Sequence, residues 1–313
     1  MDPFGIQQRG AEVPICSQAG EPAILQLIRQ HLQEVTNPAP EGIGDDCATW
    51  TPPAGETLLL TIDPVVHGIH FDNSHPPEAA GTKLLNRNLS DIAAMGGRPG
   101  PALLALAMGP DLRLDWLGRF LDGIAEACVR HAVPLAGGDI TSAPRNTFTA
   151  TLTQTGSATR PLTREGAVPG ATLWTTGQLG GSLASGRHLH FEPRLAEGQW
   201  LAAQDAVLSM TDLSDGLAKD LPGLLPSGTQ ARLDLPAIPI APEAPTLQHA
   251  LADGEDYELL FTLAPERPLP DWPFKTPVRQ IGYIAEGQPQ GTLVNLADGK
   301  TLESSPGYEH FCR

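Results

Sequence analysis

Hydrophobic positions recur with two different periods along the chain, and the period separates predicted helices from predicted strands. In the first half, spacing near 3.6 residues predicts helices over 21–35, 77–95 and 115–131. Short apolar runs predict strands over 57–62, 102–108, 133–136 and 147–155. The first half therefore reads as a mixture of helices and strands.

The second half repeats this mixture. We predict strands over 171–176, 258–263 and 280–284, helical stretches up to about residue 209, a helix over 216–225, and a hairpin within the last thirty residues. Enrichment in proline and threonine over 157–169 indicates a domain junction. We expect a flexible arm (1–18), an N-terminal domain (19–157) and a C-terminal domain (158–313), both of the α/β class.

Length and composition support this reading. The 313 residues suit two domains of about 150 residues each. The longest apolar run, 102–108, is too short to cross a bilayer, and the N-terminus lacks the pattern of a signal peptide. The four cysteines show no CxxC pair, which favours free thiols in a reducing cytoplasm. We therefore expect a cytoplasmic protein without a membrane partner.

Charge narrows the possible ligands. The formal net charge of −16 argues against nucleic acid, because phosphate backbones need lysine and arginine for neutralisation. An acidic protein binds phosphates when divalent cations lie between the two negative partners. This condition directs attention to the positions of the acidic residues.

Acidic residues recur beside glycines and next to the predicted strands. The groups are Asp45-Asp46, Asp63, Asp91 with Asn88 on the same helix face, Gly138-Asp139, Asp212 with Asp215, and Glu255-Asp256. We expect Asp63 and Asp139 to end strands, where ligands bind in α/β folds. A single aspartate beside a glycine is usually only a turn residue, but six groups favour a site for several Mg²⁺ ions.

Other signals are weaker. Gly299-Lys300-Thr301 resembles the end of a Walker A loop, but Val294 stands where its first glycine is required, so we predict a hairpin turn. His67 and His70 lie in an apparently extended segment that would point them to opposite faces, which disfavours zinc. We likewise take His188-x-His190 as no metal site and Cys47 as a packing residue.

The ordered motifs resemble a known family. They are Gly42-Ile43-Gly44-Asp45-Asp46-Cys47-Ala48, Asn88-Leu89-Ser90-Asp91-Ile92-Ala93-Ala94-Met95-Gly96, Gly137-Gly138-Asp139, Asp212-Leu213-Ser214-Asp215-Gly216-Leu217 and Gly254-Glu255-Asp256-Tyr257-Glu258-Leu259. Together they resemble the thiamine-monophosphate kinases, in the superfamily of aminoimidazole ribonucleotide synthetase. The resemblance runs from about residue 20 to the tail at 307–311.

The resemblance implies that ATP phosphorylates thiamine monophosphate to thiamine diphosphate. It implies a two-domain synthetase-like fold and a homodimer, in which the N-terminal sheets form a barrel across the interface. The implied Mg²⁺ ligands are Asp46, Thr61, Asp63, Asp91, Asp139, Asp212 and Asp215, with Asp63, Asp139 and Asp215 as catalytic residues. The implied ATP contacts are Gly138, Arg164 and Ser214, and the implied thiamine-phosphate contacts are His70, Glu255 and Tyr308.

The sequence departs from the family pattern at four places. Ile62 replaces a hydroxyl residue, His67 an acidic residue, Asn86-Arg87 a small apolar pair, and Asp253 the first glycine of a Gly-Gly-Glu-Asp motif. These changes bear on metal geometry and rate more than on the reaction class. The alternatives are a nucleotide-binding relative with little or no turnover and another synthetase of the superfamily, for which Cys312 near the C-terminus is the suggestive residue.

Overall fold

The computed structural model describes residues 48–50, 55–287, 291–302 and 307, which form two β-sheets with helices packed against them. The predicted arm, the predicted helix over 21–35, and Cys16, Cys47 and Cys312 lie outside the described residues. The described part is a mixed α/β fold, as expected. Neither sheet closes into a barrel within that part.

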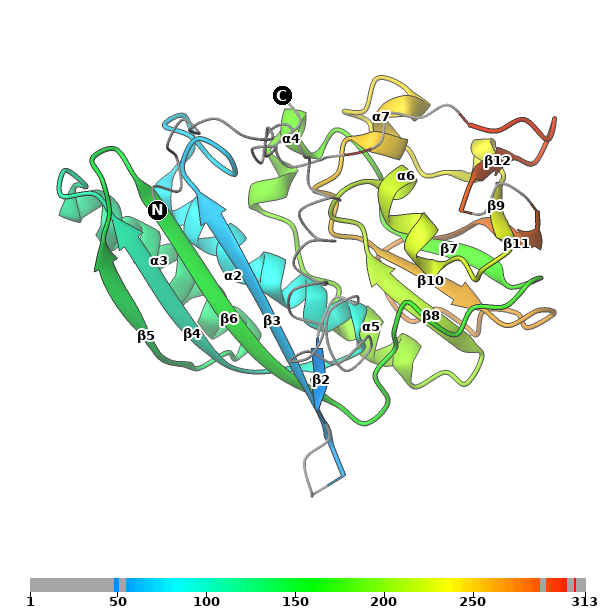
Figure 1. Cartoon of the computed structure of the whole chain (residues 1–313), viewed down its shortest axis with the longest axis horizontal. Coiled ribbons are helices and arrows are strands. Elements are labelled where there is room, and N and C mark those ends of the chain that lie inside the picture. Colours follow the sequence, from blue (N-terminus) through cyan, green and yellow to red (C-terminus); the bar gives the residue numbers. More distant parts are fainter. Residues whose placement is uncertain (1–47, 51–54, 288–290, 303–306, 308–313) are drawn as a thin grey trace, which may run out of the picture.

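The first sheet has the strand order β2-β3-β6-β4-β5 (Figure 1). Its strands are β2 (Ala48–Trp50), β3 (Thr57–Val66), β4 (Arg98–Met108), β5 (Leu135–Ser142) and β6 (Phe148–Ala158). Strands β4 and β5 run parallel and are joined by helix α3 (Leu114–His131), whereas the other pairs are antiparallel. Helix α2 (Pro77–Ala94) connects β3 to β4.

The second sheet has the order β12-β9-β11-β7-β10-β8. Its strands are β7 (Thr172–Thr176), β8 (Val207–Asp212), β9 (Thr229–Leu233), β10 (Leu259–Leu263), β11 (Val278–Glu286) and β12 (Leu293–Asn295). The helices are α4 (Ser182–Ser185), α5 (Leu195–Ala202), α6 (Leu217–Asp220) and α7 (Leu247–Ala252), with 3-10 turns at Arg187–Leu189, Leu221–Leu224 and Leu235–Ala237. Among the described strands of this second sheet, only β12 and β9 pair in parallel.

The strongly periodic helices are confirmed, because α2 and α3 match the predictions over 77–95 and 115–131 to within one residue at each end. The strands over 171–176 and 258–263 are confirmed almost as closely by β7 and β10. The hairpin turn at 299–301 is also confirmed, since Val294 forms an antiparallel bridge to Thr301. The division into domains stays a prediction.

Two of the acidic residues do not end strands, contrary to our expectation. Asp63 lies inside β3, which pairs with β6 as far as Val66. On its other edge, β3 pairs with β2 only at residues 58–60, so within the described chain that edge is open at Pro64. A proline, which has no N–H to donate, is tolerated at such a position. Asp139 lies inside β5, an edge strand that tolerates Gly137 and Gly138.

The prediction of helical stretches up to about residue 209 also extends too far, because strand β8 already begins at Val207. Strand β9 and helix α7 were not predicted. Most of the residues in β8 and β9 are buried, polar ones included, so neither strand shows the alternation of apolar and polar residues that identifies a half-buried strand.

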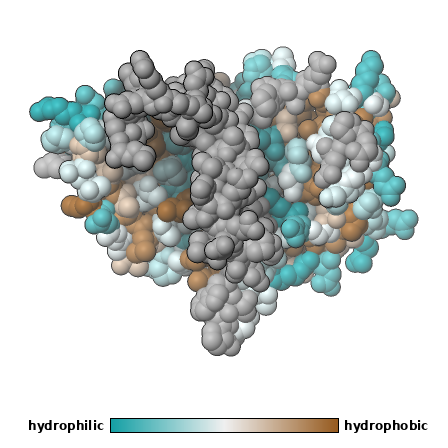
Figure 2. Space-filling view, viewed as in Figure 1, coloured by the Kyte–Doolittle hydropathy of each residue, from teal (hydrophilic) through white to brown (hydrophobic). Residues whose placement is uncertain are grey.

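Among the described residues, helices cover only one face of the first sheet. Along β6, buried and half-buried residues alternate over the whole strand. Helices α2 and α3 pack on the buried face, behind the sheet in the view of Figure 1. The opposite face exposes Leu60, Ile62 and Leu103, and Figure 2 shows hydrophobic surface on the left, where these strands lie.

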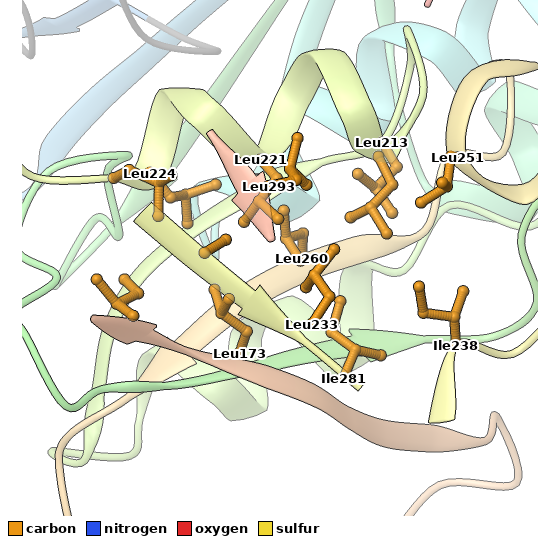
Figure 3. Packing of buried hydrophobic residues seen from close by; sticks show 14 of the residues in the cluster. Leu173, Leu213, Leu221, Leu224, Leu233, Ile238, Leu251, Leu260, Ile281 and Leu293 are labelled. Atoms are coloured by element: carbon orange, nitrogen blue, oxygen red, sulfur yellow. The ribbon is translucent and has the colours of Figure 1, made fainter. Parts of the chain in front are cut away.

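Helix α2 also packs against the second half of the chain. Ala93 and Ala94 at its end join Leu201 of α5 and Phe261 of β10 in one buried cluster. A separate leucine-rich core fills the other side of the second sheet, between β7, β9 and the α6 region (Figure 3). Helix α2 is therefore the element that the two halves share.

No described helix is both long enough and apolar enough to cross a membrane.

The crossing of α2 and α3 depends on glycines without room for a side chain. A Cβ at Gly123 of α3 would lie 2.0 Å from the carbonyl oxygen of Glu78, whereas nothing lies within 4 Å of a Cβ at Gly118. We expect Gly123→Ala to lower the free energy of unfolding by about 1–3 kcal/mol, because the two helices must separate. Gly118→Ala is the matched control and should gain up to about 1 kcal/mol from helix propensity. Urea denaturation measures both, and equal effects would contradict the packing argument.

Candidate active site

Two loops of the second half carry acidic motifs and are hydrogen-bonded to each other. The backbone N–H of Glu255 donates to the carbonyl of Ser214 at 2.7 Å, and that of Tyr257 donates to the carbonyl of Leu213 at 2.8 Å. A Cβ on Gly254 would lie 2.8 Å from the Ser214 oxygen, so glycine is required for this approach. The segments 212–216 and 254–257, far apart in the sequence, therefore form one surface.

The second of these loops has an unusual backbone. Gly254, Glu255 and Tyr257 all have positive φ angles, of 70°, 57° and 52°. Residues other than glycine seldom adopt this conformation, and such strain is concentrated at functional sites. The strained backbone supports a functional role for Glu255.

Helix α2 connects this surface to the first sheet. The Ser90 hydroxyl donates to Oδ2 of Asp212 at 2.6 Å, and Asp212 is almost fully buried. One residue further along the helix, the Asp91 carboxylate accepts a hydrogen bond from the hydroxyl of Thr61 on β3. The charges of Asp63 and Asp212 both act on the buried Tyr257 hydroxyl, so aspartates of the two halves lie close together beside α2.

Asp63 lies on the same side of β3 as Thr61, since side chains alternate along a strand. Its Oδ1 accepts a hydrogen bond from Nη2 of Arg87 at 3.2 Å. The charges of Asp63, Glu255 and Asp91 all act on this guanidinium. Burial alone would lower the pKa of Arg87, but Tyr257 and these carboxylates outweigh it and raise the pKa.

A third carboxylate joins Asp212 and Asp215. Asp220 accepts hydrogen bonds from the backbone N–H groups of Asp215 and Gly216, at 3.0 and 3.1 Å. Burial and the charges of Asp215 and Asp212 raise the pKa of Asp220 well above its ordinary value. Repulsion among carboxylates thus exists at this site, and a bound cation would relieve it.

Two cations lie beside these acids. Lys219 Nζ is 2.8 Å from Oδ2 of Asp215. The Nε of Arg164 donates to the Thr211 hydroxyl at 3.3 Å, and the positive charge of Arg164 lowers the pKa of Asp220 in opposition to burial. The structure therefore brings Arg164 to the same acidic group as Asp212 and Asp215.

A buried lysine joins two of the predicted substrate contacts. Lys83 is fully buried, and its Nζ lies 2.5 Å from Oε2 of Glu255 and 2.9 Å from Nδ1 of His188. It also donates to the carbonyl of His70 at 3.2 Å. The loop with His70 and the loop with Glu255 thus meet at one ammonium group.

Ionisation in this group follows from burial and charge. Burial lowers the pKa of Lys83, and the Glu255 carboxylate opposes that shift. Burial would raise the pKa of Glu255, but Lys83 and Arg87 outweigh it and lower the pKa. Burial and then Lys83 lower the pKa of His188 to about 4, so its ring is neutral and its Nδ1 accepts a hydrogen bond from the Lys83 ammonium.

Gly138 and Asp139 lie away from this group in a single chain. They belong to β5, which is separated from β3 by β6 and β4. At the usual spacing between strands, β5 and β3 are about 14 Å apart. The structure of a single chain therefore does not support the predicted roles of Gly138 and Asp139.

Two predicted site residues, Asp46 and Tyr308, lie outside the described residues. The described neighbour of Tyr308, Gly307, lies against the acidic loop 212–216. A Cβ on Gly307 would be 2.6 Å from the carbonyl oxygen of Asp215. The roles of Asp46 and Tyr308 stay predictions.

The comparisons with known proteins agree with this geometry. A family model described as AIR synthase related protein, N-terminal domain, matches residues 44–158. The thiamine-monophosphate kinase of Rhodopirellula baltica is 34% identical, over 84% of this chain and 89% of that protein. The enzyme of the same name from Synechococcus elongatus is 34% identical, over 94% and 97%. The chain belongs to the thiamine-monophosphate kinase family.

Solved structures of the family share the fold. The structure of AaThiL complexed with AMPPCP and TMP has a TM-score of 0.83 at 29% identity, over 96% of this chain and all of that one. Thiamine-monophosphate kinase from Stenotrophomonas maltophilia has a TM-score of 0.68 at 29% identity, over 90% and 96%. Hydrogenase maturation protein HypE in complex with ATP, at 18% identity and a TM-score of 0.63, shares the fold alone.

The departures from the family pattern have structural explanations. Ile62 points to the open face of the sheet, away from Thr61 and Asp63. The amide of Asn86 donates to the carbonyl of Phe191 at 2.7 Å and so fastens α2 to the second half. Asp253 has an ordinary φ of −66° and accepts a hydrogen bond from the N–H of Gly181, so glycine is not required there.

After β3, His67 lies in a bridge and His70 lies in a turn, instead of in an extended segment. This corrects our expectation. The ring of His67 lies 3.0 Å from the Asn73 amide oxygen, and Nδ1 of His70 accepts a hydrogen bond from the N–H of Val66. In the described part of the chain, no three histidine, cysteine, aspartate or glutamate side chains form a ready-made metal cluster.

Lys83, Lys219 and Asp220 were missed in the sequence, whereas Arg87 was noted there only as a departure from the family pattern and His188 only as no metal site. Lys83, Arg87 and Asp91 are spaced by four residues on α2, so one helical face carries all three. That spacing was available as a signal. His188 and Asp220 gave no comparable signal, because their partners lie on other segments.

Because His188 is neutral in the folded protein, we expect the free energy of unfolding to depend on pH. Below pH 6.5 the unfolded chain binds a proton that the folded His188, with a pKa of about 4, does not bind, so folding becomes less favourable as the pH falls. We expect wild-type protein to lose up to about 3 kcal/mol more unfolding free energy between pH 6.5 and 4 than His188→Gln. Denaturation at several pH values measures this. His190→Gln, at an exposed position, is the control, and parallel curves for wild type and His188→Gln would contradict the assignment.

Proposed function

We propose that this chain transfers the γ-phosphoryl group of ATP to thiamine monophosphate, giving ADP and thiamine diphosphate. One observation carries the proposal: acidic side chains from both halves of the chain meet at one face of helix α2. Asp63 and Asp91 come from the first half and Asp212 and Asp215 from the second, joined by the hydrogen bond between Ser90 and Asp212. Membership of the thiamine-monophosphate kinase family supports the same substrates.

We further propose Mg²⁺ as the divalent ion of the reaction. Mg²⁺ prefers oxygen ligands and is usually held by one or two carboxylates together with water and substrate phosphates. A preformed cluster of three carboxylates is therefore not required. The hard oxygen donors at this site fit the ion, and we assign Asp91, Asp212, Asp215 and the hydroxyl of Thr61 to it. Bound there, it would neutralise the charge of the two phosphate-bearing reactants.

The acceptor group itself explains why the site needs no dedicated base. The second pKa of a phosphate monoester is about 6, so its oxygen is already ionised at neutral pH and can attack directly. The task of the protein is to align two polyanions and to compensate their charge. Arg164, beside the acidic loop, provides a fixed positive charge for the transferring phosphoryl group. Ser214 lies in the same loop and is proposed as an ATP contact.

We assign the thiamine end of the acceptor to the loops of His70 and Glu255. Both loops contact Lys83, which fixes their relative position. Although burial opposes ionisation, the charges of Lys83 and Arg87 keep Glu255 as a carboxylate, which suits the cationic or amino edge of thiamine. The remaining predicted contact, Tyr308, follows Gly307 in the sequence.

We also propose a homodimer in the cytoplasm, with no nucleic acid or membrane partner. The open face of the first sheet supports the dimer, because Ile62, Thr153 and Leu103 stand opposite one another across β3, β6 and β4. Ile62 is 63% exposed in the single chain, and apolar surface of this kind marks an interface. Light scattering of the full chain measures the state directly, and a mass of 33.1 kDa would contradict the dimer.

The reaction is tested by ADP release with thiamine monophosphate and, in parallel, with free thiamine. We expect turnover only with the phosphorylated acceptor and only with Mg²⁺. Asp215→Asn should lower kcat by several orders of magnitude, because it removes a carboxylate that holds Mg²⁺ against the phosphates of the two reactants. Asp298→Asn, in an exposed hairpin turn, is the control and should keep full activity. Binding of ATP without turnover would support the alternative of a non-catalytic relative.

Glu255→Gln separates the acceptor end of the site from the nucleotide end. The change keeps the size of the side chain and removes its charge, so it leaves Lys83 buried without its counter-ion. We expect the KM for thiamine monophosphate to rise at least tenfold, with a small change in the KM for ATP. Steady-state kinetics in both substrates measure this, and an effect confined to the KM for ATP would contradict the assignment.

A further inference from the structure

Arg87 places a permanent positive charge among the aspartates of the site. Its Nη2 donates to Oδ1 of Asp63 at 3.2 Å, and its Nη1 donates to the carbonyl of Pro64 at 2.7 Å. The side chain is only 13% exposed. Two hydrogen bonds to β3 therefore fix the guanidinium at the position where Asp63 presents its carboxylate.

The surrounding charges show what the guanidinium does there. Lys83, one turn earlier on α2, is already paired with Glu255. The carboxylates of Asp63 and Asp91 and the charge of Glu255 all act on Arg87. A guanidinium does not lose its proton in a protein, so this positive charge is present at every working pH.

The same charge opposes a divalent ion at Asp63. A metal ion that ligates this carboxylate would lie within a few ångströms of the guanidinium, and like charges at that distance repel strongly in a partly buried site. The guanidinium also has a donor to spare, because its buried Nε has no hydrogen-bond partner among the described residues. An anionic oxygen of a bound phosphate would satisfy that donor.

We propose that the guanidinium of Arg87 takes the place of one divalent ion at Asp63. The chain then binds one metal ion fewer with its nucleotide than a variant with a neutral side chain at position 87. The inference rests on the proposed function, because it assumes a metal–nucleotide complex at this site. A purely structural role, in which Arg87 only fastens α2 to β3, would change stability and leave the number of bound ions unchanged.

The test counts Mn²⁺ ions, which report on Mg²⁺ sites, bound per chain with saturating AMPPCP. Electron paramagnetic resonance of free Mn²⁺ gives the count without turnover. We expect Arg87→Val to bind one more ion than wild type, and Arg87→Lys, which keeps the charge, to match wild type. Arg113→Val, at an exposed arginine paired with Asp115, is the control and should also match wild type.

Arg87→Gln guards against a folding defect, because its amide can still donate to the Pro64 carbonyl while the charge is removed. It should bind the extra ion even if Arg87→Val unfolds. Equal counts in wild type and Arg87→Gln overturn the inference, as does a lower count in the variant or no nucleotide-dependent Mn²⁺ binding in either protein.

ADP release by wild type with thiamine monophosphate is measured separately. Turnover together with equal ion counts would reject the role of Arg87 and keep the proposed function. An extra ion in the variants without any turnover by wild type would reject the proposed function and keep the role of Arg87.

Discussion

Negative charges held close together in a partly buried site must be compensated, and this constraint governs the central part of the molecule. Carboxylates from β3, from α2 and from two loops of the second half approach one another there. Where the chain supplies its own cations, the charges are paired, as with Lys83 and Glu255. Where several acids meet, burial first and then the charges of Asp215 and Asp212 raise the pKa of Asp220.

Helix α2 makes this arrangement possible because both halves of the chain pack against it. Its end belongs to a buried cluster with α5 and β10, while its middle covers the first sheet together with α3. Polar residues on a helix buried to this extent need partners. Ser90 meets Asp212, Asn86 meets the Phe191 carbonyl, and Lys83 meets Glu255. The same contacts that satisfy α2 therefore bring the acidic loops to their positions.

Prediction from the sequence was most successful where one segment contains its own signal. Helices α2 and α3 have a regular apolar face, so both were identified correctly. Strands β8 and β9 were missed because their buried polar residues remove the alternation. Asp63 and Asp139 were placed at strand ends because proline and glycine usually interrupt strands, but edge positions in the sheet tolerate them.

The sequence by itself determined the mixed α/β class and the family, and it predicted a functional role for the acidic residues. Only the tertiary structure decided that Asp63 is paired with Arg87 and that Lys83 joins the loops of His70 and Glu255. It also decided that two other strands separate Asp139 from β3 within one chain. The physical reason is the same in each case. Local periodicity depends on neighbours along the chain, whereas the pairing of charges depends on the packing of two sheets against one helix, which brings together residues that are distant in the sequence.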